Sequence, residues 1–245
     1  MDDIKQQADR FIRKMGLAGI ASVILILTSS TVRLPGTPIN IYTGVTPFAG
    51  FELVRSKAEL EKAMGPVDSE ARKAIAGRKA APGFDFIFSF AIGLYALSQL
   101  QWRSRPDLQR STLAGLTMLV IAMFLDYLFV HRAADAANAA VITEQAALTL
   151  RTIGWIKWSL VFTALYSCTG FLVNTPAVLR FGGNLMRMSA IAGFVAVAYY
   201  ERYVGLAVLV MFVGLCGVSA LCVFKPDLLY EAEARGAEES GDGAS

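Results

Sequence analysis

Ionisable side chains lie near the ends of otherwise apolar segments of this chain. Asp126 is about one turn from the end of the run STLAGLTMLVIAMFLDYLFV, residues 111–130, and the only histidine, His131, follows that run. Asp85 and Lys157 lie near the starts of two further apolar segments. Charges at membrane depth are costly, so they pair with one another or line a path for protons or solutes. Two carboxylates beside a lysine could also do acid–base chemistry.

The segments that must position these groups are long and apolar. Hydrophobic residues make up 55% of the 245 residues and charged residues only 18%, against about 25% charged residues in a typical soluble domain. Runs of about 20 apolar residues match the roughly 30 Å hydrocarbon thickness of a bilayer. We therefore predict an all-α, polytopic integral membrane protein with about six transmembrane helices. The predicted spans are 16–33, 84–102, 111–130, 153–173, 185–200 and 203–224.

Basic residues near the span ends predict the orientation. The N-terminal stretch, the loop at 103–110 and the segment around Arg180 and Arg187 are basic and fall on one side of a six-span arrangement. The loop between the third and fourth spans, centred on residues 133–149, is nearly neutral. We expect a multi-pass protein of a bacterial cytoplasmic membrane with both termini in the cytoplasm. The long loop at 34–83 is rich in Lys and Arg, but loops of this length obey the charge rule weakly.

Three segments are predicted to lie outside the bilayer. Residues 1–15 have apolar positions at helical spacing among basic residues, which suggests either an interfacial amphipathic helix or the frayed start of the first span. The outer loop at 34–83 should hold two short helices, the first with Ser56 and Glu59 as a capping box and the second capped by Asp68. The acidic tail at 225–245 is predicted to be disordered after a short helical start.

Helical topology brings the ionisable groups to one level near the outer interface. With six spans, Asp85, Asp126, His131 and Lys157 share that level, and we expect Asp126 to pair with Lys157, and Asp85 with Lys157 or Arg151. This cluster could bridge helices within residues 84–173, form a polar pocket for a small ligand, lipid headgroup or proton, or anchor the interface without contacts between the charges. The aromatic residues expected in an interfacial belt at this level are Tyr127, Trp155 and Trp158.

Small residues mark the last two spans, within residues 174–224. Their spacing predicts close helix packing, either between the two spans or against another subunit. The predicted packing residues are Ser189 with Gly193, Ala192 with Ala196, and Gly214 with Gly217. Along residues 84–102, Ser89 and Gln99 extend a polar stripe from Asp85, and we expect this stripe to face neighbouring helices rather than water.

Several function classes find no support in the sequence. It contains no CxxC, P-loop, HExxH or nucleophile-elbow motif, and its three cysteines all fall in apolar runs, where we expect them buried and reduced. We predict no cofactor, no metal site and, with a net charge of +3, no nucleic-acid partner.

The leading functional hypothesis is a non-enzymatic membrane protein, a structural or accessory subunit or an assembly factor of a membrane complex. Its expected partners are the lipid bilayer and other membrane subunits, which would contact the last two spans or the loop at 34–83. The alternative is a small-solute or proton transporter that uses Asp85, Asp126 and Lys157. A lipid-modifying intramembrane enzyme is the third hypothesis.

Overall fold

The computed structural model describes residues 2–31, 53–77, 86–199 and 203–229. Every regular element within these ranges is a helix, so the predicted all-α class is confirmed for the described part of the chain. The long helices are α1 (Asp2–Thr31), α5 (Phe86–Ser104), α6 (Gln109–Asn138), α7 (Glu144–Cys168), α8 (Ala177–Tyr199) and α9 (Val204–Phe224). The short ones are α3 (Lys57–Met64), α4 (Glu70–Gly77) and the 3₁₀ turns Pro106–Leu108 and Gly170–Asn174.

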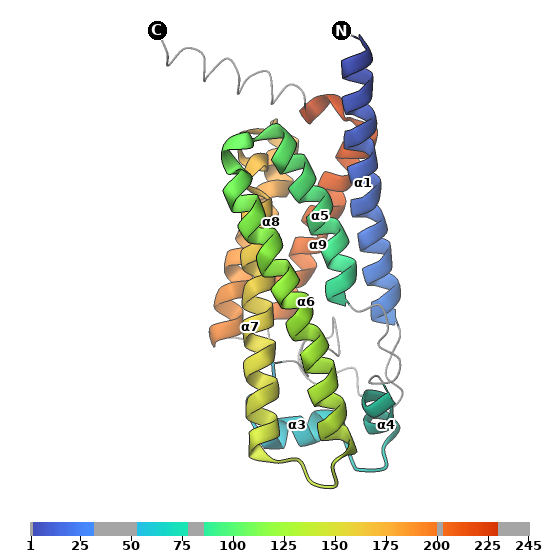
Figure 1. Ribbon diagram of the computed structural model, residues 1–245, viewed down its shortest axis with the longest axis vertical. Coiled ribbons are helices and arrows are strands. Elements are labelled where there is room, and N and C mark those ends of the chain that lie inside the picture. Colours follow the sequence, from blue (N-terminus) through green and yellow to red (C-terminus); the bar gives the residue numbers. More distant parts are fainter. Residues whose placement is uncertain (1, 32–52, 78–85, 200–202, 230–245) are drawn as a thin grey trace.

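The long helices form an elongated bundle (Figure 1). Helix α6 packs along α7, α1 packs against α5 and α9, and α8 packs between α7 and α9. The N-terminus of α1 and the α5–α6 connection lie at one end, which we call the basic end, and α3 and α4 lie at the other, the cap end (Figure 1). One apolar cluster fills the space between the long helices, and a second lies where α3 and α4 meet α6 and α7.

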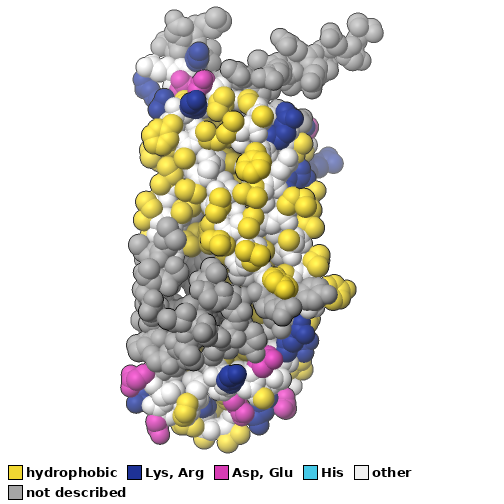
Figure 2. All heavy atoms as spheres, turned by 180° about the vertical axis from the view of Figure 1, so that it is seen from behind, with side chains coloured by type: hydrophobic (Ala, Val, Ile, Leu, Met, Phe, Trp, Pro, Cys, Tyr) yellow, Lys and Arg dark blue, Asp and Glu magenta, His cyan; other side chains and the backbone are white. Residues whose placement is uncertain are grey.

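Three helices are long and apolar enough to cross a membrane: the helical run Pro106–Asn138, which includes α6, together with α8 and α9. Figure 2 shows hydrophobic side chains over the middle of the molecule and charged side chains at its two ends. Exposed apolar residues of this kind on the three helices include Val120, Phe124, Phe181, Met188 and Val213. Such a surface suits contact with lipid. The other three predicted spans fall on α1, α5 and α7.

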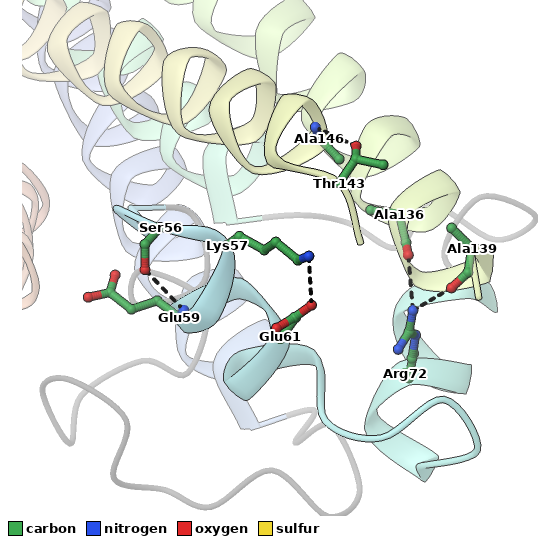
Figure 3. A network of polar contacts seen from close by, with 9 residues as sticks. All are labelled: Ser56, Lys57, Glu59, Glu61, Arg72, Ala136, Ala139, Thr143 and Ala146. Carbon is green, nitrogen blue, oxygen red and sulfur yellow. Dashed lines mark hydrogen bonds and ion pairs between the residues drawn. The ribbon is translucent and has the colours of Figure 1, made fainter. Parts of the chain in front are cut away.

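Helices α6 and α7 are longer than predicted. The segment 133–149, expected to be a loop, is mostly helical, because α6 continues to Asn138 and α7 begins at Glu144. Alanine has the highest helix propensity, and four alanines of this segment are buried in the apolar cluster that α3 and α4 share with α6 and α7: Ala133, Ala136, Ala137 and Ala147. Thr143 starts α7, since its side chain accepts a hydrogen bond from the Ala146 N–H at 3.1 Å (Figure 3).

The first predicted helix of the outer loop, α3, begins as expected. Ser56 Oγ accepts a hydrogen bond from the Glu59 N–H at 3.2 Å (Figure 3). The Glu59 carboxylate accepts from the N–H of Arg55 at 2.8 Å rather than from Ser56 itself. Gly65, at φ 75°, ends the helix. That left-handed conformation is one that glycine adopts without steric cost.

The predicted cap of α4 is wrong by one residue. Ser69, not Asp68, precedes the helix, and its Oγ accepts from the Arg72 N–H at 3.2 Å. Arg72 is itself buried and holds α4 against the end of α6 (Figure 3). Its guanidinium donates to the carbonyls of Ala137 at 2.8 Å, Ala139 at 2.5 Å and Ala136 at 3.4 Å. Carbonyls in the last turn of a helix lack intrahelical partners, so Arg72 satisfies groups that burial would otherwise penalise.

The N-terminal segment is part of the first long helix. Helix α1 runs unbroken from Asp2 to Thr31, and so includes the described residues of both the segment 1–15 and the predicted first span. Gly16 and Gly19 allow it to approach Ser219 of α9, and the Arg13 side chain donates to the Val223 carbonyl at 2.9 Å. Of the acidic tail, only residues 225–229 are described, and the prediction of disorder falls on residues outside the described part.

Candidate functional site

Asp126 on α6 and Lys157 on α7 form an ion pair inside the bundle. Lys157 Nζ donates to Asp126 Oδ1 at 2.6 Å. The Lys157 side chain is 0% exposed and the Asp126 side chain 9% exposed. The expected pairing of these two residues is therefore present. Because α6 and α7 pack along their lengths, the pair joins two helices by their charges at a buried position.

Aromatic rings lie beside the lysine. Lys157 Nζ lies 4.9 Å from the centroid of the Phe129 ring and 5.7 Å from that of Trp158. Aromatic faces attract a cation most strongly where water is excluded. Trp158 is only 3% exposed and packs near Phe162, at 5.8 Å between ring centroids. The prediction of Trp158 as an interfacial residue is therefore wrong, because Trp158 and Lys157 both lie on the buried side of α7.

Among the described residues, two other predicted members of the cluster, His131 and Arg151, make contacts away from the ion pair. His131 Nδ1 lies 3.0 Å from the Tyr127 carbonyl one turn earlier, and its ring packs on the exposed Tyr127 ring at 4.1 Å. Arg151 stacks over Trp155 at 4.4 Å and donates to the Arg55 carbonyl at 3.4 Å. Asp85 lies outside the described residues.

Arg55 marks the level at which the bundle meets the cap. Its guanidinium donates to the Tyr199 carbonyl at the end of α8, at 3.2 Å, and its own carbonyl accepts from Arg151 of α7. Lys157 comes six residues after Arg151, which corresponds to about 9 Å along the helix axis. The Asp126–Lys157 pair therefore lies deeper in the bundle than Arg151, on the side away from the cap helices.

Gln101 is a polar residue of the core that the sequence reasoning missed. Its side chain is fully buried and donates to Thr112 Oγ1 and to the Ser167 carbonyl, both at 2.7 Å. Its amide oxygen accepts from the Phe171 N–H at 3.1 Å. This one side chain joins α5, α6, α7 and the turn after α7. The predicted stripe pointed instead to Ser89, which is buried, and to Gln99, which is partly exposed.

Most of the predicted packing residues are used within the chain. Ser189 donates to the Ala207 carbonyl of α9, Gly193 lies against the Phe162 ring of α7, and Gly214 lies against Met186. Ala196 is also buried, whereas Ala192 and Gly217 are exposed. The predicted pairs of Ala192 with Ala196 and of Gly214 with Gly217 therefore do not each share one packed face.

The burial of the Asp126 and Lys157 side chains limits the chemistry that they can do. Among the described residues, no group of three or more His, Cys, Asp or Glu side chains could hold a metal ion. Cys168 and Cys222 are buried, while Cys216 is exposed, contrary to expectation.

Comparisons with protein-family models, curated proteins and solved structures return no match to this chain.

Proposed function

We propose that this chain is a non-enzymatic, multi-pass membrane protein that serves as a structural or accessory subunit, or as an assembly factor, of a membrane complex. Helices α1 and α5 to α9 would form six spans, with both termini on the cytoplasmic side and the cap helices on the other. The observation that carries this proposal is the closed ion pair between Asp126 and Lys157, whose side chains are 9% and 0% exposed.

A closed ion pair suits a bridge between helices better than a site of turnover. A transporter or an enzyme must bring a solute, a proton or a substrate to its charged groups. Asp126 and Lys157 instead meet one another at 2.6 Å, with aromatic rings against the lysine. Removing one member of such a pair takes an opposite charge away from a charge that stays buried, whereas the intact pair holds α6 and α7 in one register.

The cap end supports a role in binding other proteins. Arg72 and the second apolar cluster hold α3 and α4 firmly on the extended ends of α6 and α7. This assembly, which would lie beyond the membrane, exposes the apolar side chains of Val67, Val141 and Leu148. A rigid surface that shows apolar side chains outside lipid suits contact with a partner protein.

The test is purification from the native membrane in a mild detergent, followed by measurement of the mass and composition of the complex. We expect a stoichiometric protein partner. The purified chain is also reconstituted into vesicles and tested for proton and solute flux. A species of 26.5 kDa without a partner, together with flux that Asp126→Asn abolishes, would replace this proposal by the transporter.

A further inference from the structure

Arg187 is a cation placed within the apolar part of α8. It follows Ala177, the first residue of that helix, by ten positions, or about 15 Å of helix. Its guanidinium carbon lies 4.3 Å from the centroid of the Tyr166 ring on α7. Its Nε atom is buried and has no hydrogen-bond partner within the described part of the chain. A guanidinium at this depth is costly unless an anion joins it.

The surroundings of Arg187 indicate where that anion must come from. Arg180 and Asn184 precede Arg187 by seven and three residues, so the three share one face of α8, and both are exposed. Phe181 and Met188, their neighbours in sequence, are exposed apolar side chains typical of contact with lipid. The only acidic residue of α7 is Glu144, at the opposite end of that helix, and α8 has none.

The direction of the side chains brings this face to the membrane surface. Helical side chains lean toward the N-terminus of their helix, and α8 begins at the basic end, next to the turn after α7. Arg187 therefore extends toward the leaflet at the basic end, where long cationic side chains reach the headgroup region. Arg180 lies nearer that surface, and its Nε donates to the Thr175 carbonyl at 3.1 Å.

We propose that Arg187 and Arg180, with Tyr166 as the platform under the Arg187 guanidinium, bind the phosphate headgroup of an anionic phospholipid in the leaflet at the basic end. The planar guanidinium pairs with phosphate oxygens through two parallel hydrogen bonds, a geometry that lysine lacks. Stacking on Tyr166 fixes the plane of that group in advance. This proposal depends on α8 lying in the membrane and not on the chain acting as a subunit.

The experiment is native mass spectrometry of the full chain in mild detergent, titrated with phosphatidylglycerol or with phosphatidylcholine. We expect the wild type to retain phosphatidylglycerol preferentially, and Arg187→Gln to weaken that retention by about tenfold, the equivalent of about 1.4 kcal/mol. Arg110→Gln is the matched control, because Arg110 is an exposed arginine at the same end but on α6. It should retain the lipid as the wild type does.

Three results would overturn the proposal: equal retention by Arg187→Gln and the wild type, an equal loss in Arg110→Gln, or displacement of the lipid by millimolar inorganic phosphate. The last would identify a site for free phosphate. If Arg187→Gln does not fold, Arg180→Gln tests the same site from an exposed position and should also weaken phosphatidylglycerol binding. The lipid should raise the unfolding temperature of the wild type more than that of either variant.

Discussion

Lys157 reaches Asp126, 31 positions earlier in the chain, at 2.6 Å across the interface between α7 and α6. Neither side chain is open to the surface to any large extent. The ion pair and the aromatic faces beside the lysine stabilise these charges at their buried position. A pair of this kind fixes how two helices are rotated and how far one is shifted along the other.

Removing one charge of the pair should destabilise the fold more than removing both. Asp126→Leu or Lys157→Met alone should lower the free energy of unfolding by about 3–5 kcal/mol, because the ion pair is lost while the remaining charge stays buried. The double variant should recover most of this loss, since apolar side chains suit the position. Thermal unfolding in detergent measures the difference. Arg132→Gln, at an exposed position of α6, should change stability by no more than about 0.5 kcal/mol.

Arg72 should control the attachment of the cap helices. Arg72→Met removes three donations to the carbonyls at the end of α6 and should cost about 2 kcal/mol or more. Hydrogen exchange should rise in α3, in α4 and in the α6–α7 turn, with little change in α8 and α9. Lys73→Met is the control, because Lys73 forms only a surface ion pair with Glu70 at 3.7 Å. Equal exchange in the two variants would contradict the role assigned to Arg72.

Two glycines should respond in opposite ways to a methyl group. A Cβ at Gly193 would lie 2.3 Å from the Phe162 ring, which is buried and has little room to move. Gly193→Ala should therefore destabilise the protein by about 1–3 kcal/mol. A Cβ at Gly217 meets nothing within 4 Å, so Gly217→Ala should be neutral or stabilise α9 by up to about 1 kcal/mol. The melting temperatures of the two variants, measured in the same detergent, test this prediction. A lower melting temperature for Gly217→Ala than for Gly193→Ala would contradict it.

Gln101 should contribute more to stability than its neighbour Gln99. Gln101→Leu leaves the buried Phe171 N–H without its acceptor and breaks the contacts to Thr112 and Ser167. The expected cost is about 1–3 kcal/mol, the penalty of an unsatisfied buried group. Gln99→Leu, two residues earlier at a partly exposed position, should have a small effect. Similar losses in both variants, measured by thermal unfolding, would show that the network is not the cause.

The helices could be predicted from the sequence, but their ends and orientations only in part. Apolar runs indicate where helices form, because helices satisfy backbone groups in lipid. The alanine-rich segment 133–149 is not apolar enough to be predicted as a membrane span. It is mostly helical because alanine has a high helix propensity and because the segment packs against α4. The pairing of Asp126 with Lys157 was predictable because two opposite charges in apolar helices at one level have few other partners.

Residues whose role depends on helix rotation could not be predicted. Trp155 and Trp158 are three positions apart, yet only Trp158 is nearly fully buried. Sequence spacing does not say which face of α7 meets α6 and α8. For the same reason, the rotation of α5 could not be predicted, and Gln99 rather than Gln101 was expected to face the neighbouring helices. The burial of Arg72 could not be predicted either, because the sequence does not distinguish a buried arginine in a short helix from an arginine on a solvent-exposed face.

The most direct test is the native mass of the complex extracted in mild detergent, measured for the wild type and for the double variant Asp126→Leu/Lys157→Met. If the ion pair is a bridge between helices in a subunit, both proteins should carry the same stoichiometric partner. A wild type of 26.5 kDa that carries no partner would contradict the proposed role. A double variant that unfolds like the wild type but has lost its partner would contradict the purely structural role of Asp126 and Lys157.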